Sequence, residues 1–261
     1  MLGLERPPRW GIVTVVLLVS ANAALLAYLT LRPPSADPRA GAPAPTVATS
    51  DAAAESSTPA QSAAQSDLAG SEEQPVMAVY GDGYSAGSSM GGQADRGWPA
   101  VVAAELRADL RLNAVSMVGY AALGRTGQDF SDLVLASPEA GATVTVVFGS
   151  RNDLGQPAAV VGQQAVETYA LIRSAAPQTR LVVVGPSWSS ADVPAELRAL
   201  RDAVRSAAMD AGAVFIDPIA EEWFADPEGL IAEDGISPTD AGHAFIGTQV
   251  APVLQQVLDD A

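Results

Sequence analysis

The stretch VMAVYGDGYSAG, residues 76–87, decides the fold, because a run of apolar residues ends there at a turn built of small residues. Four more short apolar runs follow it, and amphipathic stretches with helical spacing lie between and after them. Continuous apolar runs indicate strands that are buried on both faces, and their alternation with helices is typical of a parallel sheet. We therefore predict one three-layer α/β/α domain around a five-stranded parallel sheet.

The predicted elements fill the chain from Val76 to Leu258. The strands are expected at Val76–Tyr80, Leu112–Met117, Thr143–Phe148, Leu181–Val184 and Ala213–Ile216. The helices are expected at Trp98–Asp109, Asp129–Ala136, Ala158–Ala175, Pro194–Ala211 and Pro238–Leu258. The domain is therefore assigned to residues 76–261.

A second apolar segment precedes this domain. Residues 10–31, WGIVTVVLLVSANAALLAYLTL, form an uncharged run of 22 residues behind a short tail, residues 1–9. A helix of that length spans a hydrocarbon core of roughly 30 Å, so we expect a membrane anchor with the domain outside the cytoplasm. The alternative is a secreted protein, because Ala21-Asn22-Ala23 resembles the cleavage site of a signal peptide.

The connecting segment, residues 32–75, is rich in Ala, Pro, Ser, Thr and Gln and poor in large apolar residues. Such a composition buries too little surface to offset the entropy of ordering, so we expect a disordered linker without chemistry of its own.

Composition excludes several classes of function. The formal net charge is −16, from 14 basic residues, all of them Arg, against 30 acidic ones. This balance disfavours binding to a phosphate backbone, and no nucleic-acid partner is expected. The chain has no Cys and one His, which excludes disulfides, thiolate metal sites and the usual multi-histidine zinc sites. We expect no metal or other cofactor.

Ligands of parallel α/β sheets bind at the carboxyl ends of the strands, so we expect the functional residues in the segments that follow each strand. Four segments stand out: GDGYSAG at 81–87; VGY at 118–120 with GRTG at 124–127; GSRND at 149–153; and DGISPTDAGH at 234–243. In this order they resemble the four sequence blocks of the SGNH (GDSL-type) hydrolase superfamily. The resemblance begins at Val76 and implies a flavodoxin-like SGNH hydrolase fold.

The resemblance also implies a chemistry. That superfamily hydrolyses esters and other acyl linkages with a serine in the first block, two oxyanion-binding residues in the middle blocks, and an Asp-x-x-His pair in the last. The oxyanion positions match Gly119 and Asn152, and the pair matches Asp240 and His243. The superfamily often carries a second His where Ser237 stands. The implied ligands are small esters, lipids or carbohydrate esters.

The nucleophile position holds Gly83, which has no side chain to attack an ester. We therefore expect hydrolysis to be weakened or lost. Ser85, two residues on, is a possible substitute, and water activated by His243 is another. A different class of function is a binding domain without catalysis that uses the former active-site cleft.

Structural roles also account for several of these residues. Asp240 fits a capping box with Ser237 as the N-cap and Pro238 at the first helical position. Asn152 fits an Asx turn, and Gly119 fits a tight turn. The glycines of the first block also match a dinucleotide-binding pattern, but the predicted second strand ends without the carboxylate that would contact a ribose.

Overall fold

The computed structural model describes residues 74–149 and 151–260 of the 261-residue chain. The expected anchor at residues 10–31 and most of the expected linker lie outside these ranges. Within them, no helix is both long and apolar enough to cross a membrane.

The centre of the fold is a five-stranded parallel sheet, which confirms the predicted sheet type. Its strands stand in the order β2-β1-β3-β4-β5. They are β1 (Val76–Gly81), β2 (Asp109–Ala114), β3 (Val144–Phe148), β4 (Arg180–Val184) and β5 (Val214–Ile216). All four pairings are parallel, so every strand ends at the same edge of the sheet.

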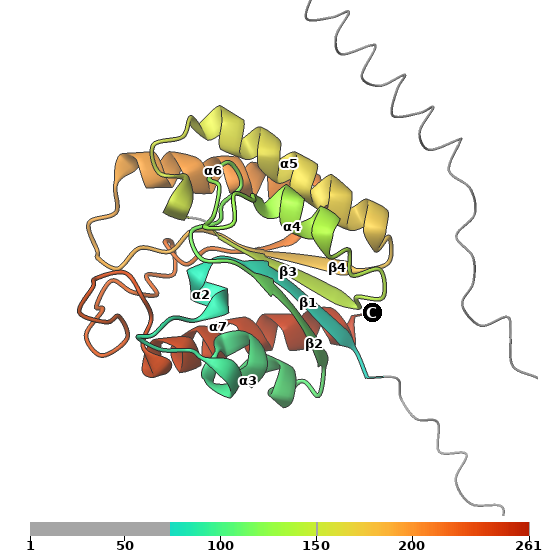
Figure 1. The fold of residues 1–261 in the computed structure, drawn as a ribbon, viewed down its shortest axis with the longest axis horizontal. Helices are drawn as coiled ribbons and strands as arrows, with labels where there is room; N and C mark the ends of the chain where they lie inside the picture. Colours follow the sequence, from blue (N-terminus) through green and yellow to red (C-terminus); the bar gives the residue numbers. More distant parts are fainter. Residues whose placement is uncertain (1–73, 150, 261) are drawn as a thin grey trace, which may run out of the picture. The chain divides into compact units, whose positions relative to one another are not determined.

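Helices cover both faces of the sheet, as expected for three layers. On one face lie α4 (Phe130–Ala136), α5 (Ala158–Ala175) and α6 (Ala195–Asp210); on the other lie α3 (Trp98–Glu105) and α7 (Asp240–Asp259) (Figure 1). Two short helices, α2 (Gly83–Ala86) and the 3-10 turn η2 (Arg151–Asp153), follow β1 and β3 directly. A second 3-10 turn, η1 (Ala94–Arg96), precedes α3.

The alternation of side chains along the strands divides the apolar core in two. Ala78 and Tyr80 of β1 pack on the side of α4, α5 and α6, whereas Met77 and Val79 pack toward α3 and α7. The same alternation holds in β4. Because both faces are buried, the strands read as continuous apolar runs, and for this reason the sequence predicts them well.

Three predicted elements had wrong bounds. The helix predicted at Trp98–Asp109 ends at Glu105, and Asp109 belongs to β2. The second strand runs from Asp109 to Ala114, three residues before the predicted start, with Asp109 paired to Val76. As an edge strand it leaves Leu112 43% exposed, so it lacks the apolar run that marks its neighbours. The last helix begins at Asp240, with Thr239 as the N-cap that accepts the N–H of Gly242, so Asp240 is not part of a capping box with Ser237.

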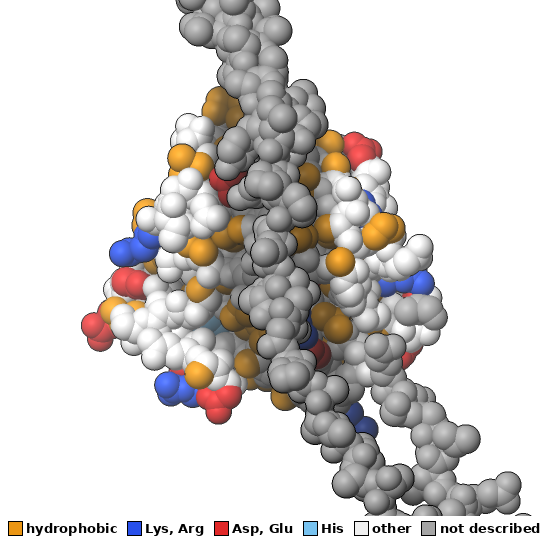
Figure 2. All heavy atoms as spheres, turned by 45° about the vertical axis from the view of Figure 1, so that its right-hand side comes forward, with side chains coloured by type: hydrophobic (Ala, Val, Ile, Leu, Met, Phe, Trp, Pro, Cys, Tyr) orange, Lys and Arg blue, Asp and Glu red, His pale blue; other side chains and the backbone are white. Residues whose placement is uncertain are grey.

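The edge at which the strands end carries α2 and the long segment before α7, on the left of Figure 1. In the space-filling view of Figure 2, the visible basic and acidic side chains are scattered among hydrophobic and uncharged ones. The face seen in Figure 2, onto which the right-hand side of Figure 1 is turned, is therefore mixed in character rather than a basic strip.

Candidate active site

The first block forms a tight turn from β1 into α2, and Asp82 holds it. One carboxylate oxygen of Asp82 accepts the backbone N–H of Tyr84 at 2.9 Å, and the other accepts the side-chain amide of Asn152 at 2.7 Å. Burial raises the pKa of Asp82 to about 6, and these hydrogen bonds oppose the rise. The first and third blocks are thereby joined through their side chains.

Gly83, which the sequence analysis matches to the nucleophile position, is the first residue of α2. Its φ angle lies outside the left-handed region, and a Cβ built there would meet no atom closer than the Ser116 Oγ at 3.9 Å. The turn therefore has room for a side chain that the sequence does not supply.

Ser85, the expected substitute for a nucleophile at position 83, lies inside the fold. Its side chain is buried, with 1% exposure, and its Oγ has no hydrogen-bond partner among the described residues. The hydroxyl lies so close to Gly81 that any Cβ at position 81 would overlap it. A buried hydroxyl without a base is neither accessible to an ester nor activated.

The two residues expected to be oxyanion donors, Gly119 and Asn152, both hydrogen-bond to oxygen atoms of the protein. The N–H of Gly119 donates to the carbonyl of Ala122 at 2.9 Å. Both hydrogens of the Asn152 amide are accounted for, because it donates to Asp82 and, at 2.8 Å, to the carbonyl of Val118. Asn152 connects three loops instead of presenting its amide to a ligand.

Asp153, which the sequence analysis did not single out as a site residue, organises the second block. Its fully buried carboxylate accepts the backbone N–H groups of Tyr120, Ala121 and Ala122 at 2.8–2.9 Å. A Cβ at Gly119 would lie 2.5 Å from this carboxylate. Glycine is thus required there for close packing against Asp153.

The expected Asp240–His243 pair is not formed. Asp240 accepts the N–H of Gly92 at 2.9 Å and pairs with the guanidinium of Arg96 at 2.6 Å. The Nδ1 of His243 accepts the N–H of Trp98 at 3.4 Å, and its Nε2 is buried without a partner among the described residues. Burial lowers the pKa of His243 to about 4, and the charge of Asp240 opposes this only in part.

His243 is therefore enclosed between α7 and the segment before α3, with no exposed surface. Its imidazole is therefore packed inside the fold in this structure. The last block contains the Asp-x-x spacing twice: once from Asp240, ending at His243, and once from Asp234, ending at Ser237.

The earlier of these two segments lies beside the first block. Asp234 accepts the N–H of Ile236 and both the N–H and the hydroxyl of Ser237, at 2.6–2.8 Å. The hydroxyl of Tyr84, in α2, donates to the carbonyl of Ile236 at 2.7 Å. The segment that follows β4 also contacts the Asp234–Ser237 loop, because the Oγ of Ser189 donates to the carbonyl of Gly235 at 2.7 Å.

The candidate site is therefore the turn at Gly83 together with the Asp234–Ser237 loop, which the hydrogen bond from Tyr84 to Ile236 joins to α2. Arg151 lies over Trp188, with Cζ 4.7 Å from the ring centroid, and sequence reasoning missed both residues. No signal in the third block distinguished Arg151 from a surface residue. Within the described ranges, no group of three His, Cys, Asp or Glu side chains is placed to hold a metal ion.

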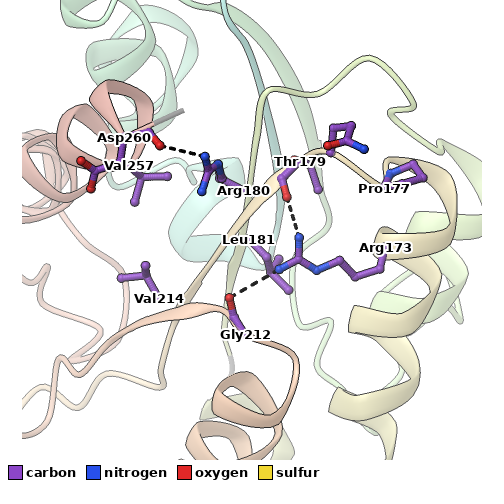
Figure 3. Close-up of a pocket in the computed structure, with 10 residues that line it drawn as sticks. Arg173, Pro177, Thr179, Arg180, Leu181, Gly212, Val214, Val257 and Asp260 are labelled. Atoms are coloured by element: carbon purple, nitrogen blue, oxygen red, sulfur yellow. Dashed lines mark hydrogen bonds between the residues drawn. The ribbon is translucent and has the colours of Figure 1, made fainter.

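A cavity of about 560 Å³ lies at the opposite edge of the sheet, where β4 and β5 begin (Figure 3). The two arginines that line it hydrogen-bond to backbone carbonyls. Arg173 donates to the carbonyls of Thr179 and Gly212, and Arg180 donates to the carbonyl of Asp260. Their role is to tie the chain together at this end of the molecule.

Comparisons with known proteins identify the family of the chain. A model of the GDSL-like lipase/acylhydrolase family matches residues 79–245. A GDSL lipase of Mycobacterium tuberculosis is 36% identical over 190 residues, which cover 70% of this chain and 82% of the lipase.

Solved structures share the fold at lower identity. The crystal structure of TesA aligns with a TM-score of 0.58 and 20% identity, covering 70% of this chain and 99% of TesA. A family two carbohydrate esterase from Cellvibrio japonicus aligns with a TM-score of 0.58 and 14% identity, covering 71% of this chain and 62% of that one. The family model and the 36% identical lipase place the chain by sequence, and these structures match its sheet and helices: the chain belongs to the GDSL-like lipase/acylhydrolase family.

Proposed function

We propose that this chain is an ester-binding member of the GDSL family in which serine-dependent hydrolysis is strongly reduced or absent. One observation carries the proposal: among residues 74–149 and 151–260, no nucleophile and base face each other at the turn after β1. Gly83 offers no hydroxyl, Ser237 stands where the family often carries a histidine, and His243 is enclosed.

The engaged oxyanion donors support the same conclusion. Serine hydrolases that lose their catalytic triad keep a residual acceleration of about 10³–10⁴-fold over water, which comes from the oxyanion hole and from binding. Here the N–H of Gly119 and the amide of Asn152 already donate to protein oxygens. We therefore expect even this residual rate to be diminished.

Hydrolysis of p-nitrophenyl butyrate by the purified full chain tests the proposal. The expected rate is close to that in buffer alone, and neither Ser85→Ala nor His243→Gln changes it. Strong hydrolysis that Ser85→Ala abolishes would mean that Ser85 is the nucleophile. Strong hydrolysis that survives Ser85→Ala but not His243→Gln would mean that His243 activates water. Either result contradicts the proposal.

We further propose that residues 10–31 anchor the domain at the outer face of a membrane. The support is the uncharged run of 22 residues, whose exposure to water is costly. Fractionation of cells that express the full chain tests it, with recovery in the membrane fraction as the expected result. A soluble protein whose sequence begins directly after Ala23 would contradict the anchor and support a secreted form.

A further inference from the structure

We propose that the cavity at the edge where β4 and β5 begin binds a phosphate monoester of a small apolar alcohol. Arg180 and Arg173 hold the phosphate group, and the apolar part lies against Val214 and Val257. The inference does not depend on the proposed function, because this cavity lies at the opposite edge of the sheet from the turn at Gly83.

The cavity is large enough for a small organic molecule. Its volume is about 560 Å³, and pockets for small ligands typically measure about 300–1,000 Å³. It lies beyond the first residues of β4 and β5, with α5 on one side and the end of α7 on the other (Figure 3). Ligands of parallel α/β folds usually bind at the other edge of the sheet, so the fold itself does not account for this cavity.

Two arginines reach the cavity from different layers of the fold. Arg173 extends from α5, and its guanidinium donates to the carbonyl of Thr179 at 2.6 Å and to that of Ala211 at 3.2 Å. Arg180, the exposed first residue of β4, donates from its Nη2 to the carbonyl of Asp260 at 2.8 Å. These hydrogen bonds hold both side chains in place at the cavity, and Arg180 keeps its other N–H groups for a ligand (Figure 3).

The charges of these two arginines are not paired with carboxylates of residues 74–149 and 151–260. The ion pairs in those ranges involve Arg96, Arg111 and Arg201, and neither Arg173 nor Arg180. The whole chain carries 30 acidic residues against 14 basic ones, so a cavity with two unpaired guanidinium groups is locally opposite in charge to the protein around it. The cavity therefore favours an anion.

The arrangement of the two guanidinium groups selects the kind of anion. A phosphate monoester carries a charge of about −1.5 to −2 at neutral pH and has several strongly accepting oxygens. These oxygens point in different directions, so they can accept hydrogen bonds from groups that arrive from two layers, whereas a planar carboxylate presents both its oxygens on one side. A doubly charged group also gains more than a singly charged one from two positive charges.

Apolar side chains line another part of the same cavity. Leu181, Val214 and Val257 belong to its wall, and Val214 is 43% exposed. An alkyl group that covers this exposed surface removes apolar area from water, which favours binding. The cavity thus combines a positive part for a phosphate with an apolar part for a short alkyl chain.

The test compares butyl phosphate with butyl sulfate by calorimetric titration of the purified full chain at about pH 8. At that pH the phosphate ester is doubly charged, whereas the sulfate ester has the same shape and a single charge. Butyl phosphate is expected to bind at least about fivefold more tightly, as one added charge contact near a protein surface would give. Inorganic phosphate, which lacks the alkyl group, is expected to bind more weakly than butyl phosphate.

Two pairs of variants assign the binding to this cavity. Arg180→Gln should reduce the preference for butyl phosphate to less than about twofold, whereas Arg205→Gln, which removes an exposed arginine of α6, should preserve it. Val214→Glu places a carboxylate in the wall of the cavity and should abolish the preference, whereas Val214→Gln, of the same size but neutral, should preserve it. Circular dichroism verifies that each variant is folded.

Equal affinities for butyl phosphate and butyl sulfate in the wild type would overturn the inference without recourse to any variant. A preference that persists in folded Arg180→Gln or Val214→Glu would overturn it as well, as would succinate, a doubly charged carboxylate, that displaces butyl phosphate at equal concentration. Where the preference holds, phosphatidate in neutral detergent micelles distinguishes the source of the phosphate. Displacement of butyl phosphate by phosphatidate would assign a lipid head group, and lack of displacement a water-soluble ester.

Discussion

His243 and Gly92 are packed so closely that the Nε2 of the imidazole lies where any side chain at position 92 would begin. Gly92 also donates its N–H to Asp240 at 2.9 Å, one helical turn before His243. The segment before α3 is thereby fastened onto the start of α7 at two points. Asp240 and His243 act here as parts of a helix–loop contact, and this role accounts for both residues.

Gly92→Ala is expected to destabilise the fold by about 2–5 kcal/mol. The φ of +72° costs about 1–2 kcal/mol for a non-glycine residue, and overlap with the imidazole adds about 1–3 kcal/mol. Gly127→Ala is the matched control, because Gly127 has a φ of +74° and nothing within 4 Å. Urea unfolding measures both, and equal losses of stability would show that His243 does not enclose position 92.

The stability of the fold should depend on pH through His243. Burial lowers its pKa from 6.5 to about 4, so between these values the unfolded chain binds a proton that the folded chain does not. The free energy of unfolding therefore falls as the pH falls from about 6.5 toward 4. Burial of Asp82 acts in the opposite direction, because its raised pKa of about 6 favours the folded state at low pH.

The contribution of His243 is isolated by comparing the wild type with His243→Gln, since both proteins contain Asp82. Between pH 7 and pH 5 the wild type should lose more free energy of unfolding than the variant does. Urea titrations at several pH values measure the two slopes. Parallel profiles would mean that His243 is not buried in its neutral form.

Asp153→Asn is expected to destabilise the fold by about 2–3 kcal/mol. The substitution replaces one of two carboxylate oxygens that accept three backbone N–H groups at a fully buried site, and the new amide group finds donors rather than acceptors around it. Asp210→Asn, at the exposed end of α6, should change stability by less than about 0.5 kcal/mol. Similar losses in the two variants would contradict the organising role of Asp153.

Much of the fold is predictable because the central strands are buried on both faces and therefore apolar throughout. The helix Ala158–Ala175 was predicted with its observed bounds, and the third and fourth strands within a residue. β2 was misplaced because an edge strand shows no such pattern: it contains Asp109, Arg111 and Asn113. Its position is set by its pairing with β1. A local sequence pattern carries no information about that pairing.

The site is less predictable than the fold, because its residues act through contacts between distant loops. Asn152 resembles an oxyanion donor in sequence, but its two amide hydrogens go to oxygens of Asp82 and Val118. The Asp-x-x spacing occurs at both Asp234 and Asp240, and only the hydrogen bond from Tyr84 to Ile236 shows which copy borders the turn after β1.

The choice between these two copies is testable in the variant Gly83→Ser/Ser237→His, which supplies a hydroxyl at the turn and an imidazole three residues after Asp234. We expect measurable esterase activity in this variant. Adding Asp234→Asn should lower the activity by about 10⁴-fold or to background, because the histidine loses the carboxylate that orients it. Adding Asp240→Asn should leave activity within a few-fold, and the reverse pattern would assign the pair to Asp240 and His243.

Labelling by a fluorophosphonate probe, which reacts with activated serines, gives the most direct measure of whether the site contains a nucleophile and a base. The wild-type chain and Gly83→Ser alone should remain unlabelled, because His243 is enclosed and Ser237 is no base. Gly83→Ser/Ser237→His should be labelled at position 83. Labelling of the wild type at any serine of the domain, or of Gly83→Ser as strongly as the double variant, would contradict the absence of a nucleophile–base pair.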